Sequence, residues 1–127
     1  MQHARFLIGA GATAWLIAGY PAQPISQTGG ATVIAAGDHL DRDLRPGVTH
    51  SYAVDLHAGE FLHAVVAPRG IDVEARLIGP EGHELLAVDL PYDHLVAETI
   101  MTIGERDGRY EIRVRPVVEN APAGRYT

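Results

Sequence analysis

Hydrophobic and polar residues alternate with a period of two along most of the chain after residue 30. The clearest example is the range 109–118, where Tyr110, Ile112 and Val114 fall on one face and mostly charged residues on the other. This period places one face of a strand in a core and the other in water. The same kind of pattern, or a short apolar run, predicts further strands over residues 31–36, 38–44, 48–56, 61–67, 71–77, 83–90 and 95–103.

The range 61–67 differs from the others because it is apolar on nearly both of its faces. That composition predicts a central strand that is covered on each side. In the range 71–77, by contrast, Ile71, Val73 and Ala75 share an inward face, and Asp72 and Glu74 are expected to point outward.

Turn residues separate these predicted strands every 8–12 residues or so, which is the rhythm of a β-sandwich or barrel. The turns are Arg45-Pro46-Gly47, Ala58-Gly59, Arg69-Gly70, Gly79-Pro80-Glu81-Gly82 and Asp107-Gly108. The fourth predicts a hairpin, because proline presets the first corner and glycine allows a positive φ near the exit. No range after residue 30 shows a sustained helical period, so the predicted fold class is all-β.

Composition agrees with one β-rich domain in a chain of 127 residues. The 14 Gly and 8 Pro disfavour a helical bundle, and 46% hydrophobic residues are enough for a core. Cysteine is absent, which excludes disulfides, thiolate catalysis and cysteine-ligated metals. All 10 basic residues are Arg, against 16 acidic ones, and the net charge of −6 excludes nucleic acid as an expected partner.

The N-terminal segment has the layout of a secretory signal peptide. Arg5 precedes an uncharged apolar run over residues 6–20, and Pro21 and a polar stretch follow it. We therefore expect a signal peptide or anchor helix over residues 1–22 and a polar linker over residues 23–30. Cleavage after Ala22 would place the large Tyr20 at position −3, so an uncleaved anchor remains the alternative. The expected location is periplasmic or extracellular, with membrane contact only through an uncleaved segment.

The order and spacing of several short motifs resemble the bacterial pre-peptidase C-terminal (PPC) type domains over residues 31–127. The motifs are Arg45-Pro46-Gly47, Ser51-Tyr52-Ala53-Val54-Asp55-Leu56, Ala58-Gly59-Glu60-Phe61-Leu62, Arg69-Gly70-Ile71-Asp72-Val73, Leu77-Ile78-Gly79-Pro80-Glu81-Gly82, Glu98, Gly108-Arg109-Tyr110 and Ala123-Gly124-Arg125-Tyr126. The resemblance implies an exported, jelly-roll-like antiparallel β-sandwich without an active site of its own. Such domains flank secreted proteases, or precede tetratricopeptide repeats and a caspase-like CHAT domain, and this chain is more similar to the second setting.

The end of the chain departs from the family pattern. A last strand should run on after Gly124-Arg125-Tyr126, and only Thr127 follows here. We therefore expect a sandwich that lacks its last strand and can self-associate through an unpaired edge strand. The expected partner is otherwise another protein or a downstream domain of the same polypeptide.

Seven histidines raise the question of a catalytic or metal site. No pair has the H-E-x-x-H spacing, and no G-x-S-x-G motif accompanies them. His57 and His63 flank the Ala58-Gly59 turn and could meet across a hairpin, but two ligands do not make a zinc site. We expect them to be solvated turn residues, and we expect His50 to be a core or rim residue with one bonded nitrogen. A hydrolase would need a Ser, His and Asp cluster assembled only in three dimensions. No catalytic residue and no enzymatic activity are therefore predicted.

Asp38, Asp41 and Asp43 are weak candidates for a calcium site, because calcium prefers clustered oxygen ligands. The glycine and terminal glutamate of an EF-hand loop are missing. Aspartate is also common in turns, where its side chain bonds the local backbone. The structural interpretation is favoured, and no metal or other cofactor is predicted.

Two further groups have structural interpretations. Arg109, Arg113 and Arg115 alternate with Glu111 on an outward face, which predicts cross-strand ion pairs rather than a binding surface. Tyrosines 110 and 126 each follow a Gly-Arg pair at a strand entry, where a buried ring with a bonded hydroxyl is expected.

The function predicted from these observations is a non-catalytic, exported accessory or interaction module. The alternative is a carbohydrate- or ligand-binding sandwich, with or without the assistance of calcium. Sugar binding usually depends on stacked aromatic rings. Aromatic residues make up only 6% of this chain, and its one tryptophan, Trp15, lies in the N-terminal segment.

Overall fold

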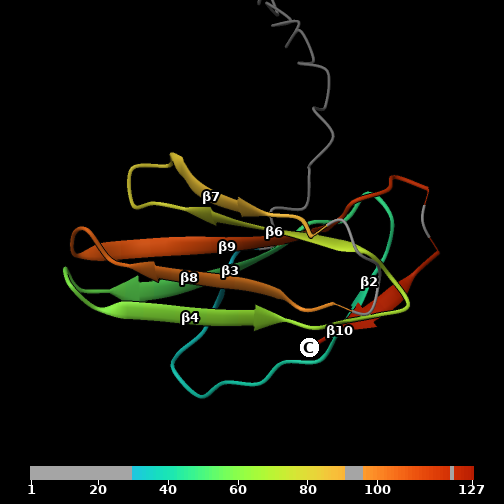
Figure 1. Ribbon diagram of the computed structural model, residues 1–127, viewed down its shortest axis with the longest axis horizontal. Coiled ribbons are helices and arrows are strands. Elements are labelled where there is room, and N and C mark those ends of the chain that lie inside the picture. The colour runs from blue at the N-terminus through green and yellow to red at the C-terminus, as the bar shows by residue number, and fades with distance from the viewer. Residues whose placement is uncertain (1–29, 91–95, 121) are drawn as a thin grey trace, which may run out of the picture.

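The computed structural model describes residues 30–90, 96–120 and 122–127 (Figure 1). These residues form an all-β, sandwich-like fold with no helix. The strands are β1 (Thr32–Val33), β2 (Arg42–Leu44), β3 (His50–Leu56), β4 (Phe61–Val66), β5 (Pro68–Arg69), β6 (Val73–Ile78), β7 (Glu84–Val88), β8 (Glu98–Ile103), β9 (Gly108–Pro116) and β10 (Gly124–Tyr126). The predicted signal or anchor segment, residues 1–22, and linker residues 23–29 lie outside the described residues. The described part of the chain contains no helix long and apolar enough to cross a membrane.

The first layer is a five-stranded sheet in the order β1-β3-β9-β6-β7. Its pairs are antiparallel, except for the short parallel pair of β1 with β3. The longest strand, β9, lies in the centre, where Ile112 is opposite Tyr52 of β3 and Leu77 of β6. Inward side chains of β3, β9 and β6 therefore share one face.

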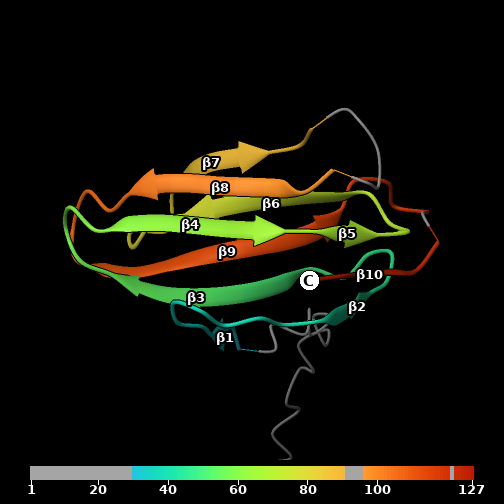
Figure 2. The same cartoon turned by 60° about the horizontal axis from the view of Figure 1, so that its bottom comes forward.

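The second layer is built from two short sheets, β4-β8 and β2-β10-β5. Only Ala67 separates β4 from β5. The backbone N–H of Ala67 donates to the carbonyl of Thr127 at 2.8 Å, and the N–H of Thr127 donates back to Ala67 at 3.0 Å. The two short sheets thus form one continuous layer in the order β8-β4/β5-β10-β2, in which β4 and β5 follow one another (Figure 2).

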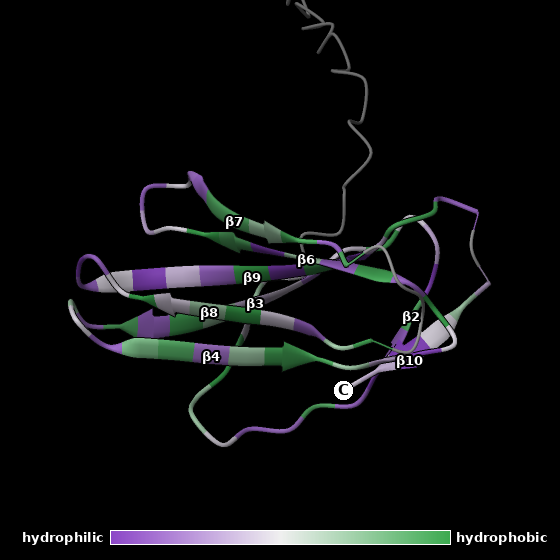
Figure 3. Ribbon diagram, in the orientation of Figure 1, coloured by the Kyte–Doolittle hydropathy of each residue, from purple (hydrophilic) through white to green (hydrophobic). Residues whose placement is uncertain are grey.

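The core lies between these two layers. It is formed by the inward faces of β3, β6 and β9 together with those of β4, β8 and β10; among its members are Leu44, Tyr52, Val54, Leu62, Val66, Ile71, Val73, Leu77, Ile100, Tyr110, Ile112, Val114 and Tyr126. Figure 3 shows the banded hydropathy of β9, whereas β4 is hydrophobic along most of its length. The alternation along residues 109–118 thus predicted the buried face of β9 correctly.

The predicted hairpin at residues 79–82 is confirmed. The N–H of Gly79 donates to the carbonyl of His83 at 2.8 Å, and Gly82 has a φ of +83°. A side chain rarely adopts this backbone conformation, so glycine suits the position. The turn joins the antiparallel pair β6 and β7.

The prediction that residues 61–67 are covered on both faces is wrong. Leu62 and Val66 point into the core, while Phe61 and Val65 are exposed. No described element packs over the outer face of β4, because the layer containing β4 is itself one of the two outer layers of the sandwich.

Candidate functional site

One edge of β4 has no strand beside it among the described residues. Along Phe61–Val66, β4 pairs with β8 alone. Ala67 directs both of its backbone groups away from β8, to Thr127. Because backbone groups of successive residues in a strand point to opposite edges, those of Val65, His63 and Phe61 point toward the same side as those of Ala67. In the described part of the chain, the donors and acceptors along this open edge have no backbone partner.

A cavity of about 760 Å³ lies alongside the open edge. On one side it is bounded by the segment 33–40, which leads from β1 toward β2, and on the other by β3 and β4. Its lining includes core side chains such as Val54, Leu62 and Val66, and it also includes Tyr126 and Thr127. The cavity is therefore a groove into the sandwich, and β10 ends at it.

A strand could fit this groove in a defined register. Tyr126 is opposite Pro68, and Thr127 is bonded to Ala67. An extended segment that prolonged this ladder would lie opposite Val66 first and Phe61 last. It would pair with the open edge of β4 and place every second side chain over the core residues that line the groove.

The outer face of the β4–β8 ladder is apolar. Phe61 is opposite Ile103, and His63 is opposite Met101. The exposed fractions are 61% for Phe61, 60% for Ile103 and 59% for Met101. Contiguous exposed apolar residues of this kind are characteristic of interaction surfaces.

A chain of hydrogen bonds lies at the β10 end of the groove. Nδ1 of His50 is 2.7 Å from the hydroxyl of Tyr126, which also contacts the hydroxyl of Tyr52. Burial, and then the charge of Arg42, lower the pKa of His50. Burial, and then the bond with Tyr52, raise the pKa of Tyr126, so its hydroxyl keeps its proton. The predicted buried ring and bonded hydroxyl of Tyr126 are confirmed, as is the bonded nitrogen of His50.

Tyr110 also has the predicted structural role. Its ring is buried, and its hydroxyl donates to the carbonyl of Arg106 at 3.0 Å. This bond ties the turn between β8 and β9 to the start of β9.

His57 and His63 do not meet across a hairpin, because the Ala58-Gly59 turn carries the chain from one layer to the other. The side chain of His57 is 85% exposed and lies 3.7 Å from Asp107. His63 is exposed on the outer face of β4, opposite Met101. Both are solvated, as predicted, although only His57 lies at the turn.

The three aspartates proposed as weak calcium candidates each have a separate partner. Asp38 accepts the backbone N–H of Ala35 at 2.9 Å. Asp41 accepts the hydroxyl of Thr127, a bond that lowers the pKa of its carboxyl. Asp43 pairs with Arg125 at 3.0 Å. The structure does not bring these carboxylates together into one group.

The outward arginines form ion pairs, of which those of Arg109 and Arg115 are cross-strand as expected, whereas Arg113 pairs with Glu111 of its own strand. Arg109 binds Asp55 with two nitrogens, at 2.9 and 3.1 Å, and Arg113 lies 2.7 Å from Glu111. Arg115 and Arg76 instead bind Glu74, which was expected to point into water and is only 7% exposed. The two arginine side chains cover this glutamate.

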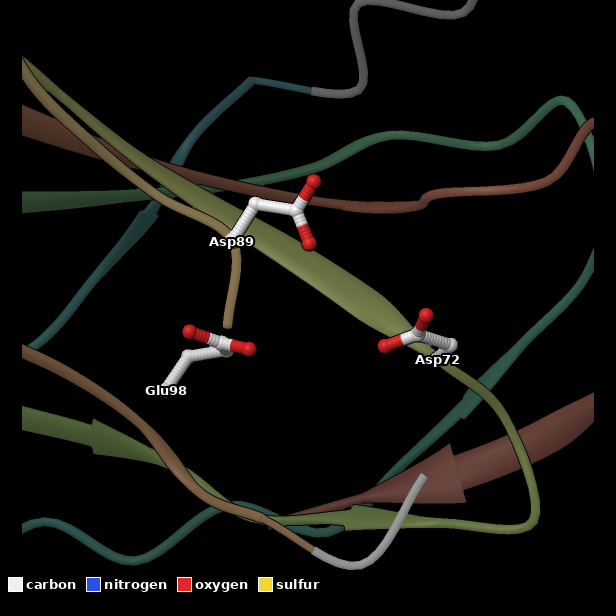
Figure 4. Close-up of side chains that lie close together, drawn as sticks. All are labelled: Asp72, Asp89 and Glu98. Atoms are coloured by element: carbon white, nitrogen blue, oxygen red, sulfur yellow. The ribbon is translucent and has the colours of Figure 1, made fainter. Parts of the chain in front are cut away.

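A different carboxylate group does come together in the fold. Ligand oxygens of Asp72, Asp89 and Glu98 all lie within 4.8 Å of one another, and no other such group of three occurs in the part of the chain that the structure describes. Figure 4 shows the three side chains, which come from different segments. Sequence reasoning did not find this group because its members are far apart along the chain.

No protein-family model matches this chain, and no curated protein matches it.

Proposed function

We propose that this chain is a non-catalytic, exported accessory module of the PPC type, which binds an extended segment of a partner protein along the open edge of β4. The observation that carries the proposal is the groove of about 760 Å³ beside that edge. Unpaired strand edges are templates for another chain, and addition of a strand combines backbone hydrogen bonds with side-chain specificity.

The strand order supports a PPC-type jelly roll. From β2 to β10 the chain crosses between the two layers at each connection, apart from the β6–β7 hairpin and the junction of β4 with β5. Two facing antiparallel sheets connected in this way are typical of a jelly roll. Export and the PPC assignment rest on the sequence motifs described above.

The groove specifies the chemistry of the partner. A segment paired with β4 would place alternate side chains over Leu62, Val66 and Val54, so these should be apolar. Its other side chains would extend the outer face, where Phe61 and Met101 are already exposed. The partner is therefore a stretch of extended polypeptide with apolar residues at every second position.

A tethered strand tests this proposal. Eight residues of alternating Val and Thr are added after Thr127, since about eight residues span a typical strand. The matched control has proline at alternate positions, which removes the donors that would face β4. We expect the first protein to melt at a higher temperature than both the parent chain and the control. The amides of Phe61, His63 and Val65 should gain protection from hydrogen exchange. Equal melting temperatures and unprotected amides would refute strand binding.

The same test includes an arm in trans. The free eight-residue peptide, added to the unmodified chain, should protect the same amides and raise the melting temperature with increasing peptide concentration. A peptide with proline at alternate positions should do neither. Size-exclusion chromatography of the parent and the tethered form then shows whether an occupied groove reduces self-association.

The groove also supports a second candidate function, the binding of an apolar small molecule. Its volume falls within the range of about 300–1,000 Å³ that is usual for ligand pockets. A carbohydrate fits less well, because Phe61 is the one exposed aromatic residue among those described. An apolar fluorescent probe that binds without protecting the amides of β4 would favour a small ligand over a strand.

A further inference from the structure

Three acidic side chains converge where the two layers approach each other at one end of the sandwich. Asp72 precedes β6, Asp89 follows β7, and Glu98 is the first residue of β8. Thus the segments next to β6 and β7 of the first layer and the first residue of β8 of the second layer each contribute one carboxylate (Figure 4). The arrangement is a property of the tertiary fold and not of any local motif.

Glu98 is the buried member of this carboxylate cluster. It is 2% exposed, and its Oε1 accepts the backbone N–H of Leu90 at 3.1 Å. Its Oε2 is buried and has no hydrogen-bond partner among the described residues. A buried carboxylate oxygen without a donor or a cation is costly, so the fold needs a compensating group here.

No such group is supplied by the described arginines and histidines, none of which pairs with Asp72, Asp89 or Glu98. The other buried glutamate shows the contrast, because Glu74 is bound by both Arg76 and Arg115. The described charged groups that influence Glu98 are Asp89 and Asp72, and both add further negative charge.

We propose that Asp72, Asp89 and Glu98 bind a calcium ion. All the side-chain ligands are oxygens of carboxylates, the kind of ligand that hard cations prefer, whereas zinc favours histidine and cysteine. Calcium–oxygen bonds are about 2.3–2.6 Å long, so oxygens on opposite sides of the ion are about 4.6–5.2 Å apart. Oxygens that lie within 4.8 Å of one another therefore fit one calcium coordination sphere.

The exposure of the three residues suits an exchangeable ion. Asp89 is exposed and Asp72 is half-buried, so the ion can enter from solvent and keep bound water. Calcium takes six to eight ligands, and three carboxylates that bind through one or two oxygens each would leave the remainder to water and backbone carbonyls. Magnesium requires a stricter octahedral geometry and gives up its bound water reluctantly. We therefore expect this irregular group of carboxylates to bind magnesium more weakly than calcium.

Bound calcium would join the two layers of the sandwich. Because the folded state alone brings the three carboxylates together, binding should raise stability by mass action. Calcium sites of extracellular modules have dissociation constants of about 10⁻⁴–10⁻³ M, so the effect should saturate at millimolar calcium.

The test uses the full chain after removal of divalent ions with a chelating resin. Calcium chloride is titrated to about 10 mM, ten times the weaker limit of that range, while thermal melting is followed by circular dichroism and binding by calorimetry. We expect a saturable rise in melting temperature and a smaller rise with magnesium. The variants Asp72→Asn and Glu98→Gln should each weaken calcium binding by about tenfold or more, which corresponds to about 1.4 kcal/mol.

Asp43→Asn is the matched control, because Asp43 is exposed and pairs with Arg125 outside the cluster. It should bind calcium as the unmodified chain does. Absence of binding at 10 mM calcium, or unchanged binding in folded Asp72→Asn and Glu98→Gln, would overturn the proposal. Binding lost only in Asp43→Asn would overturn it too and place the ion near the other aspartates. None of these outcomes bears on strand binding along β4.

Discussion

The hydroxyl of Tyr126 lies 2.7 Å from Nδ1 of His50. These residues are 76 positions apart, and the bond joins β10 of one layer to the start of β3 in the other. The same hydroxyl contacts Tyr52, so three polar groups at the edge of the core satisfy one another. This arrangement makes the end of β10 a structural element of the sandwich and leads to the first prediction.

Tyr126→Phe should lower the free energy of unfolding by about 1–3 kcal/mol, because it leaves the buried hydroxyl of Tyr52 and Nδ1 of His50 without their partner. Urea denaturation measures the change. Tyr110→Phe is the control, since the hydroxyl of Tyr110 bonds the backbone of Arg106, donating to its carbonyl at 3.0 Å and accepting from its N–H at 3.5 Å. If Tyr126→Phe lowered the free energy of unfolding no more than the control does, the hydrogen bonds among His50, Tyr126 and Tyr52 would add no extra stability.

His50 should make the stability depend on pH. Its pKa is lowered in the folded state by burial and by the nearby Arg42, from the usual 6.5. The folded state therefore binds the proton less readily than the unfolded chain. The contribution is fully present above about pH 6.5 and is lost as the pH falls from there toward the lower folded pKa. His50→Gln should remove this slope in urea melts, whereas His57→Ala should leave it intact.

We predict that Glu74 contributes more to the free energy of unfolding than an ordinary surface ion pair does. Burial opposes its ionisation, but bonds from Arg115 and Arg76 outweigh burial and lower its pKa below the usual 4.5. Its contribution is present above about pH 4.5 and is lost as the pH falls through the folded value. Glu74→Gln should cost about 1.5–3 kcal/mol near neutral pH, as expected for hydrogen bonds to charged groups.

The exposed pair of Glu111 with Arg113 is the control for Glu74. Glu111→Gln should cost no more than about 1 kcal/mol, because surface pairs are weak. If urea denaturation showed equal losses of unfolding free energy for Glu74→Gln and Glu111→Gln, the two covering arginines would add no stability beyond that of a surface ion pair.

Replacing both His57 and His63 by alanine should change the free energy of unfolding by no more than about 0.5 kcal/mol, because both side chains are solvated. Thermal melting and metal analysis of the purified protein check this expectation. Loss of bound zinc, or of a hydrolytic activity present in the parent chain, would contradict the structural interpretation of these histidines.

Gly124→Ala should destabilise the protein, because a Cβ at this position would lie 2.6 Å from Cβ of Ile71 and 3.0 Å from the carbonyl oxygen of Arg69. Ile71 is a core residue, so relief of this clash requires a shift of packed atoms. We expect a loss of about 1–3 kcal/mol in urea denaturation. Gly30→Ala, where nothing lies within 4 Å, should be neutral. A neutral Gly124→Ala would show that β10 can move away from the core.

Alternation and short apolar runs predicted most strands, and alternation predicted several of their buried faces. For β9 it identified Tyr110, Ile112 and Val114 as the inward set, because each side of that strand has a single environment. It failed for Phe61 and Val65, whose apolar character suggested a covering layer that the described fold does not have. Hydrophobicity reports what a residue prefers, and it does not report whether another element packs against that residue.

The candidate sites depended on tertiary contacts that no local pattern encodes. Asp72, Asp89 and Glu98 converge only when the β6–β7 hairpin lies beside β8. The sequence did hold one clue to Glu98. It lies two positions before Ile100 in β8, so both side chains point to the inner face of that strand. Alternation along β6 placed Glu74 on the outward face. Alternation takes no account of the long side chains of Arg76 and Arg115, which fold over Glu74.

The position of β10 between β2 and β5 sets the order in which this fold can be completed. During synthesis from the N-terminus, residues 42–44 and 68–69 emerge long before residues 124–126, which form the strand between them. Formation of that strand requires closure of loops of more than 50 residues, a class of contact that forms slowly. A nascent chain would therefore remain incompletely folded even after most of its residues have been synthesised. Under the proposed export, this delayed closure keeps the chain in an unfolded state that can still be translocated.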